Sequence, residues 1–253
     1  MSAQLFLQLD SARAFASLAY APMSGGSDAR EPSLSALALL AEWAGVGGVS
    51  LSAQHDTLTD FTQELTRLKA ELTIPINAQL SPDMDITRLA FELQPSRVTL
   101  IPPRWVGPSV VGGVDPHQLS DGLKKQITQL HEADVEVAVR VEPALDLIKR
   151  LQRYDIDVLT FSTQALISAG RGTARRERFK QLADASLLAS RLGFKVGVAG
   201  GLDLAAVEQV CRVPQVSEVH VGHALLSRAM LRGVERASQD FMGGVERGRQ
   251  RSL

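Results

Sequence analysis

Two glycine-ended segments late in the chain combine residue types and spacing that fit a defined chemistry. Segment 195–201 reads KVGVAGG and segment 218–224 reads EVHVGHA, and an amphipathic helical pattern follows each one. Glycine lets a backbone approach an anion, and the first turn of a helix offers free N–H groups and the positive end of its dipole. The predicted phosphate ligands are Gly200, Gly201, Gly222 and His223. Alternatively, the glycines only form tight turns and His223 packs at a helix start.

Polar residues at other predicted strand ends are further candidates for ligand binding. Arg140 and Glu142 lie two residues apart on one predicted strand, so their side chains point to the same side. They form either a buried ion pair or a site in which Arg140 binds an anion. Arg104 is either a phosphate ligand or a surface residue, and His55 with Asp56 is either an acid–base pair or a solvated loop. Four further polar candidates for ligand contacts are Asp10, Gln54, Ser162 and Thr163.

Eight short segments rich in β-branched and other apolar residues are predicted to be the strands that position these residues. They read LFLQLD (5–10), GGVSLS (47–52), PINAQL (75–80), SRVTLIP (96–102), VEVAVRVE (135–142), DVLTFST (157–163), KVGVAGG (195–201) and EVHVGHA (218–224). Segments with helical apolar spacing lie between and after them. Strict alternation of strand and helix favours parallel strands joined by right-handed crossovers.

Eight such units in 253 residues are typical of an α/β fold of the (β/α)8 TIM barrel type. In that fold the carboxyl ends of the strands carry the functional residues. A doubly wound open sheet is the alternative, but SARAFA follows Asp10 where a G-x-G-x-x-G dinucleotide motif would be expected. No internal linker interrupts the pattern, so we expect a single domain over residues 1–253. The Gly/Ser-rich segment 21–33 is predicted to be a long first loop.

Composition excludes several classes of partner. The formal net charge is −1, which provides no overall basic field for nucleic acid or an anionic membrane. The arginine-rich stretch 171–178 is expected to be solvated surface. A single cysteine excludes an internal disulfide and a multi-thiolate metal site, and scattered histidines give no metal motif. We therefore expect a cytoplasmic protein with no membrane span, no metal and no cofactor.

The succession of motifs resembles the pyridoxine 5′-phosphate synthase family, whose barrel closes the pyridine ring in one route to vitamin B6. The clearest similarity is LGFKVGVAGGL (192–202) followed by VHVGHALLSRAM (219–230). REPSLSALALLAEWAGVGGVSLS (30–52) resembles the second unit of the family, and GGVD (112–115) resembles its GGLD segment. FLQLD (6–10) resembles the first strand, which ends N-I-D-H in the family. The resemblance implies a homo-oligomer that condenses 1-deoxy-D-xylulose 5-phosphate with 3-amino-2-oxopropyl phosphate.

At the positions that the resemblance assigns to catalysis, the chain departs from the family. The two family glutamates fall on Gln79 and Thr160, and two family histidines fall on Ser52 and Gly200. The family's second-strand arginine falls on Gln54, and its first-strand Asn and His fall on Gln8 and Ser11. Asp10 is retained. Glutamine keeps the hydrogen-bonding capacity of glutamate but cannot accept a proton near neutral pH.

Three hypotheses for function follow. The chain is a divergent member, a candidate pseudoenzyme, that binds a phosphorylated small molecule at the loops after strands 7 and 8 and has lost ring closure. Alternatively, it performs a changed chemistry in the same barrel mouth. The third hypothesis is an active pyridoxine 5′-phosphate synthase, a transferase with reassigned acid–base groups. The loss of carboxylates at Gln79 and Thr160 favours the first hypothesis.

Overall fold

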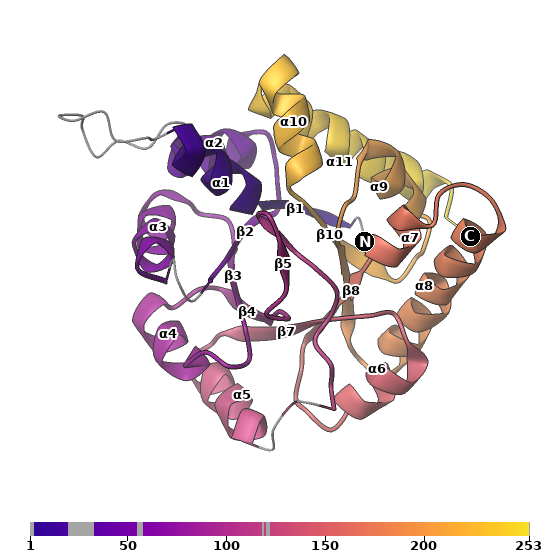
Figure 1. Ribbon diagram of the computed structural model, residues 1–253, viewed down its shortest axis with the longest axis horizontal. Coiled ribbons are helices and arrows are strands. Elements are labelled where there is room, and N and C mark those ends of the chain that lie inside the picture. Colours follow the sequence, from indigo (N-terminus) through magenta and orange to yellow (C-terminus); the bar gives the residue numbers. More distant parts are fainter. Residues whose placement is uncertain (1–2, 20–32, 55–57, 118, 120–121, 253) are drawn as a thin grey trace.

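The computed structural model describes residues 3–19, 33–54, 58–117, 119 and 122–252, and its centre is a closed barrel of parallel strands (Figure 1). Around the ring the strand order is β1, β10, β9, β8, β7, β4, β3 and β2. The strands are β1 (Gln4–Gln8), β2 (Gly48–Ser52), β3 (Ile76–Leu80), β4 (Arg97–Leu100), β7 (Glu136–Val141), β8 (Val158–Ser162), β9 (Lys195–Ala199) and β10 (Val216–Val221). The prediction of a (β/α)8 barrel is confirmed, and each strand overlaps one of the predicted segments, although β1 and β10 begin before theirs.

Helices surround the barrel and bury its outer face. They are α1 (Asp10–Ala19), α2 (Leu34–Trp43), α3 (Leu58–Glu71), α4 (Ile86–Leu93), α5 (Gly122–Glu132), α6 (Leu145–Leu151), α7 (Gln164–Ser168), α8 (Thr173–Arg191), α9 (Leu204–Val210), α10 (His223–Arg232) and α11 (Val234–Gln250). The core between barrel and helices consists of apolar side chains such as Phe61, Leu65 and Leu159, which are fully buried. This core holds the strand ends in fixed positions.

The structure differs from the predicted element boundaries in three places. Asp10 was expected to end the first strand, but it is the first residue of α1, where an acidic side chain is favourable. The short helix α7 separates β8 from α8. The helical pattern predicted after the last strand is divided between α10 and α11, because Gly233 has a φ of +79° that ends the first helix.

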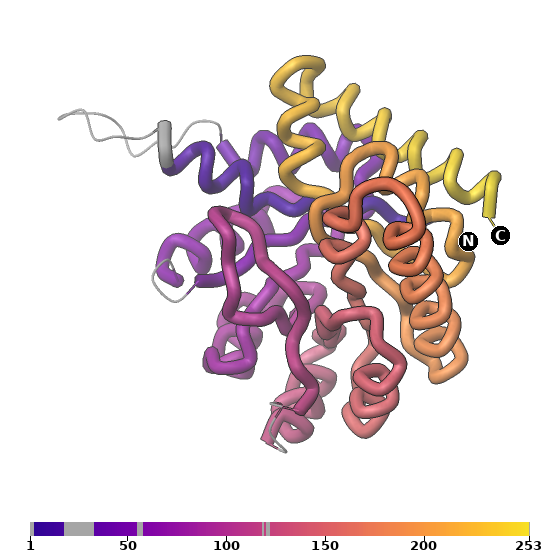
Figure 2. Tube along the Cα trace, turned by 45° about the vertical axis from the view of Figure 1, so that its right-hand side comes forward, coloured from indigo at the N-terminus to yellow at the C-terminus, as the bar shows by residue number. Residues whose placement is uncertain are grey.

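An additional hairpin follows β4 and was not predicted. Its strands, β5 (Trp105–Val106) and β6 (Ser109–Val110), pair antiparallel. In Figures 1 and 2 this segment runs across the face of the barrel at which the parallel strands end. Two-residue strands carry almost no periodicity, which explains why the sequence pattern did not reveal them. The hairpin therefore covers part of the barrel mouth.

Polar and charged side chains fill much of the barrel interior. Arg97 of β4 forms a bidentate ion pair with Glu218 of β10, with 2.7 Å between Nη2 and Oε1. Above this pair the ring of His220 stacks on Phe6 with 4.8 Å between ring centroids. Gly48 accommodates the Phe6 ring, because a Cβ atom at position 48 would lie 2.3 Å from it. The interior is therefore packed around Phe6, and His220 also lines the open space nearer the mouth.

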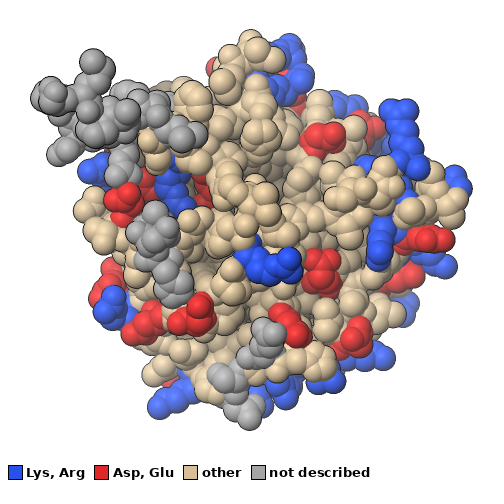
Figure 3. All heavy atoms as spheres, viewed as in Figure 1, with Lys and Arg blue, Asp and Glu red and all other residues tan. Residues whose placement is uncertain are grey.

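Charged residues of both signs are interspersed around the outline of the face in Figure 3. The arginine-rich stretch 171–178 lies on the surface in and before α8, and Arg175 there donates to Gln209 of α9. None of the helices in the described part of the chain is long and apolar enough to cross a membrane.

Candidate functional site

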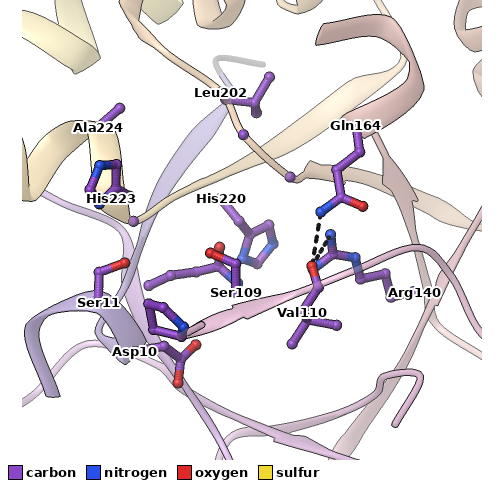
Figure 4. Close-up of a pocket in the computed structure, with 15 residues that line it drawn as sticks. Asp10, Ser11, Ser109, Val110, Arg140, Gln164, Leu202, His220, His223 and Ala224 are labelled. Carbon is purple, nitrogen blue, oxygen red and sulfur yellow. Dashed lines mark hydrogen bonds between the residues drawn. The ribbon is translucent and has the colours of Figure 1, made fainter. Parts of the chain in front are cut away.

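A cavity of about 120 Å³ lies at the carboxyl ends of the barrel strands, and we refer to it as the mouth cavity (Figure 4). Residues after β1, β9 and β10 form one part of its wall, and β7, α7 and the tip of the hairpin form the rest. Barrel enzymes place their chemistry at this end of the strands. The cavity is therefore the candidate functional site.

The structure brings the four predicted phosphate ligands together in this cavity. Gly200 and Gly201 follow β9, Gly222 and His223 follow β10, and all four line the wall. Gly200 has a φ of +117° and Gly201 a φ of +73°, which are conformations that side chains rarely adopt. These two positions therefore require glycine on backbone grounds.

The N-terminus of α10 is open toward the mouth cavity. Gly222 is the N-cap residue, and no side chain among the described residues hydrogen-bonds to the cap. A Cβ atom at Gly222 would lie 3.1 Å from the backbone oxygen of Gln8, so glycine also permits close contact with β1. The first N–H groups of a helix have no intrahelical partner. This helix start can therefore bind an anion through main-chain groups.

The helix start after β9 is arranged differently from the expectation. We expected a free helix N-terminus there, but the side chain of Asp203 accepts a hydrogen bond from Ala206 N at 2.7 Å and caps α9. A carboxylate at this cap also opposes the binding of a second anion at α9. The β9 side of the cavity is therefore formed by the glycine loop and not by a helix dipole.

Arg140 of β7 presents a buried charge to the mouth cavity. Its residue exposure is 3%, and its guanidinium donates to the backbone oxygen of Val110 at 3.3 Å. Burial lowers the pKa of Arg140 to about 10, although the charges of Glu142 and Asp10 act in the opposite direction. Arg140 therefore remains protonated at neutral pH. Among the described residues no ion pair joins it to Glu142, so the structure does not form the predicted alternative of a direct pair.

Gln164 connects the hairpin to the rest of the cavity wall, and sequence reasoning missed it. Its amide nitrogen donates to Val110 O at 3.0 Å, and its amide oxygen accepts from Gly112 N at 2.7 Å. The residue begins α7, directly after β8 and its flanking Thr163. That position after a strand was the one signal in the sequence that could have identified it.

A hydrogen-bonded cluster around Ser52 contains the retained acidic residue. Asp10 accepts from Ser52 N at 2.9 Å and from Ser52 Oγ at 2.8 Å, and Ser52 Oγ also lies 3.0 Å from Gln79 Oε1. Burial raises the pKa of Asp10, although Arg13 and the hydrogen bonds from Ser52 oppose this effect. Gln79 Oε1 also accepts a hydrogen bond from Gln8 Nε2 at 3.4 Å. Asp10 is thus the acidic group beside Gln79.

The other predicted site residues lie outside the lining of the mouth cavity. Thr160 is buried, and its Oγ1 would lie 3.1 Å from a Cβ atom at Gly197. Thr163 Oγ1 donates to Gly200 O at 2.6 Å, so it supports the glycine loop. Ser162 and Thr163 line a smaller cavity of about 30 Å³ with Glu142. Gln54 lies two residues after β2 and lines none of these cavities.

Two further groups of candidates also lie elsewhere. Arg104 lines a separate cavity near α5. His55 and Asp56 lie outside the described residues. Within the ranges that the structure describes, no group of three or more His, Cys, Asp or Glu side chains is arranged to hold a metal ion.

Comparison with known families and sequences gives one consistent match. Residues 25–246 match the family described as "Pyridoxal phosphate biosynthesis protein PdxJ". Pyridoxine 5′-phosphate synthase from Geotalea daltonii is 26% identical over 216 residues, which cover 85% of this chain and 90% of that protein. The synthase from Coxiella burnetii strain Dugway is 27% identical over 204 residues, which cover 81% and 85% of the two chains.

Solved structures with the same architecture include proteins of other families. The tryptophan synthase subunit alpha from Legionella pneumophila has a TM-score of 0.61 at 11% identity, and the match covers 96% of this chain and 93% of that one. The 3-keto-L-gulonate-6-phosphate decarboxylase from Vibrio cholerae has a TM-score of 0.62 at 12% identity, covering 98% and 99%. At these identities the likeness shows the barrel fold alone.

Proposed function

The chain belongs to the PdxJ family of pyridoxal phosphate biosynthesis proteins, and we propose that its barrel binds a phosphorylated small metabolite while ring closure is lost or altered. The observation that carries this proposal is the mouth cavity. It joins the uncapped start of α10 to Gly200 and Gly201, which are held in conformations accessible to glycine. A phosphate at a helix N-terminus with glycine on its approach side is a common arrangement in barrels of this type.

The proposed loss of ring closure rests on the side chains that occupy the expected catalytic positions. Gln79 and Thr160 replace the two glutamates of the family resemblance, and Ser52 and Gly200 replace two histidines. Gln79 and Ser52 are committed to one hydrogen-bonded cluster with Asp10. A positioned acid or base typically contributes about 10²–10⁴ in rate, so the loss of several leaves little catalysis by the family route.

The buried position of Asp10 favours altered chemistry as a second candidate function. Asp10 lines the mouth cavity, and burial raises its pKa, so it retains a proton at higher pH than an ordinary aspartate does. A group of this kind can exchange one proton with a bound ligand. An active synthase, the third hypothesis, would need acid–base groups other than Gln79 and Thr160, and Asp10, His220 and His223 are the titratable candidates that line this mouth beside Arg140.

The direct test of lost ring closure is an assay with both substrates of the family. Purified protein is incubated with 1-deoxy-D-xylulose 5-phosphate and 3-amino-2-oxopropyl phosphate, and pyridoxine 5′-phosphate is measured by chromatography. We expect no product above background and no rescue of a vitamin B6 auxotroph. Turnover comparable to that of a synthase assayed in parallel would refute the proposal of lost catalysis.

Phosphate binding is tested separately at the start of α10. Ala224 lies in the first turn of α10 and lines the mouth cavity. A carboxylate there favours the helix but repels an anion, so Ala224→Asp should preserve the melting temperature and weaken glycerol 3-phosphate binding by about tenfold or more. Ala224→Asn is the matched uncharged control and should bind within about threefold of the parent. Equal affinity of both variants in calorimetry would contradict a phosphate site here.

The resemblance also implies a homo-oligomer, which we include in the proposal. Light scattering coupled to size-exclusion chromatography measures the mass in solution. A mass equal to that of a single 27.3 kDa chain at micromolar concentration would contradict it.

A further inference from the structure

The mouth cavity contains a buried positive charge that no carboxylate of the described chain neutralises by direct contact. Arg140 is 3% exposed, its Nε has no hydrogen-bond partner among the described residues, and Nη2 contacts only the carbonyl oxygen of Val110, at 3.3 Å. Burying a charge without a paired and hydrogen-bonded partner is strongly unfavourable. A buried arginine of this kind is expected where an anion completes the site.

One of the two acidic residues whose charges act on Arg140 is already engaged elsewhere. Asp10 accepts two hydrogen bonds from Ser52 and lies 3.4 Å from Nη2 of Arg13. Its charge acts on Arg140 through space, but no direct ion pair forms between the two side chains in the described structure. Glu142 likewise acts on Arg140 only at a distance. Arg140 therefore keeps its guanidinium available to a ligand.

The glycine loop makes room for this guanidinium. A Cβ atom at Gly200 would lie 2.9 Å from Arg140 Nη2. Any other residue at position 200 would therefore force the end of the Arg140 side chain to shift. The loop at Gly200 therefore leaves space for the Arg140 guanidinium as well as exposing main-chain groups to the cavity.

The two anion-binding features lie on opposite sides of the same cavity. Arg140 and Gln164 lie on one side in Figure 4, and His223 and Ala224 at the start of α10 lie on the other. At about 120 Å³ the mouth cavity is smaller than the roughly 300–1,000 Å³ of pockets for drug-sized ligands. One small molecule can reach both sides, whereas a large metabolite cannot be enclosed.

From this arrangement we infer that the ligand is a small phosphorylated carboxylic acid, with its phosphate at the start of α10 and its carboxylate on Arg140. The inference rests on the proposed phosphate site and adds the second anionic group. A guanidinium presents a planar set of donors that matches a carboxylate in bidentate geometry. A neutral hydroxymethyl or ketone group at this position would leave the arginine charge buried and unpaired.

A pair of probes that differ in the carboxylate tests this assignment. We expect 3-phosphoglycerate to bind at least about tenfold more tightly than glycerol 3-phosphate in calorimetry, which corresponds to about 1.4 kcal/mol. Arg140→Met removes the charge at similar length and should reduce this preference to within about threefold, whereas Arg140→Lys should retain part of it. Equal affinity of the parent protein for the two probes, or an undiminished preference in Arg140→Met, would overturn the inference.

The melting temperature without ligand separates a binding role from a structural one. If Arg140 awaits an anion, Arg140→Met removes an unpaired buried charge and should leave the melting temperature unchanged or raise it. A large decrease would mean that the guanidinium stabilises the fold, and would contradict the inference.

The two proposals fail in distinguishable ways. Binding of glycerol 3-phosphate that Ala224→Asp abolishes, without any preference for 3-phosphoglycerate, refutes the carboxylate assignment and supports the phosphate site. Binding of D-glycerate that depends on Arg140, without binding of glycerol 3-phosphate, refutes the phosphate site and supports the role of Arg140. Absence of binding of all three probes at millimolar concentration contradicts both.

Discussion

Gly200 shows how a single residue combines a backbone requirement with a requirement for space. Its φ of +117° is rarely accessible to other residues, and its missing side chain leaves room for Nη2 of Arg140. The resemblance to the synthase family expects histidine here. In this chain the guanidinium of Arg140, a residue of β7, occupies the space beside the loop. This contact is therefore one of the features on which the proposed change of chemistry rests.

The cost of a side chain at Gly200 can be separated from the cost of its backbone conformation. Gly172 has a similar φ of +112° but nothing within 4 Å of its would-be Cβ atom. Backbone strain should lower the free energy of unfolding by about 1–3 kcal/mol in both Gly200→Ala and Gly172→Ala. Gly200→Ala should lose about 1–3 kcal/mol more, because its Cβ overlaps Arg140. Urea denaturation of the two variants measures the difference, and equal losses would show that the arginine adapts without cost.

At the scale of elements, the hairpin β5–β6 depends on α7 for its position over the mouth. Gln164 at the start of α7 contacts both Val110 and Gly112, so one side chain holds the strand β6 and the turn that follows it. Further along, Gly113 permits close approach to β7, because a Cβ atom there would lie 2.5 Å from Glu142 N. The segment is therefore anchored on α7 and on the end of β7.

Removing the Gln164 side chain should loosen the hairpin without unfolding the barrel. Gln164→Ala loses two hydrogen bonds, which are together worth about 1–3 kcal/mol, and it frees the Gly112 amide. We expect hydrogen exchange in the peptide covering 105–117 to become at least about tenfold faster. Gln239→Ala is the control, because Gln239 is exposed and contacts Glu235 within α11. Unchanged exchange in Gln164→Ala would show that other contacts hold the hairpin.

Across the whole molecule, an ion pair links opposite sides of the barrel. Arg97 lies on β4 and Glu218 on β10, and the ring order places these strands opposite each other. Glu136 at the start of β7 also binds Arg97, at 2.6 Å, and Lys195 of β9 binds Glu136 at 2.7 Å. The network closes the end of the barrel away from the mouth. It therefore affects the stability of all the strands that it joins.

Breaking one side of this pair should cost more than replacing both. Glu218→Gln leaves Arg97 with Glu136 as its remaining carboxylate partner among the described residues, and we expect a loss of about 1–3 kcal/mol in the free energy of unfolding. The double variant Arg97→Met with Glu218→Met removes both charges and should recover most of that loss. Chemical denaturation of the two variants measures the coupling. If the double variant has a lower free energy of unfolding than Glu218→Gln, the charge left on Arg97 is not the main cause of the loss.

Acid should weaken the fold through the same pair. Burial alone would raise the pKa of Glu218, but hydrogen bonds and charges from His220 and Arg97 lower it to about 2. Because the folded pKa lies below the unfolded value of 4.5, the stabilisation is complete above pH 4.5 and is lost as the pH falls toward 2. The loss amounts to roughly 3 kcal/mol. Denaturation curves between pH 6 and pH 2 should show it, and the Arg97→Met, Glu218→Met double variant should lack this component.

The sequence by itself determined the strands, their alternation with helices and the glycines that close the last two units. These features depend on local periodicity and on backbone freedom, which neighbouring residues specify. The strand alternation sufficed to predict a barrel, and the barrel placed Gly200, Gly201, Gly222 and His223 at one end. The same patterns missed α7 and the hairpin, which are too short to show a period.

Only the tertiary structure decided which polar groups are paired and which remain available. Gln8 meets Gln79 across 71 residues of sequence, and Gln164 meets Val110 across 54. Local spacing left two interpretations open for Arg140, an ion pair with Glu142 or an anion site. Among the described residues no ion pair joins Arg140 to Glu142, and its Nε has no hydrogen-bond partner, while anion binding by Arg140 stays a proposal. Hydrogen bonds and charges act across the closed ring, between residues whose distance the order of the chain does not specify.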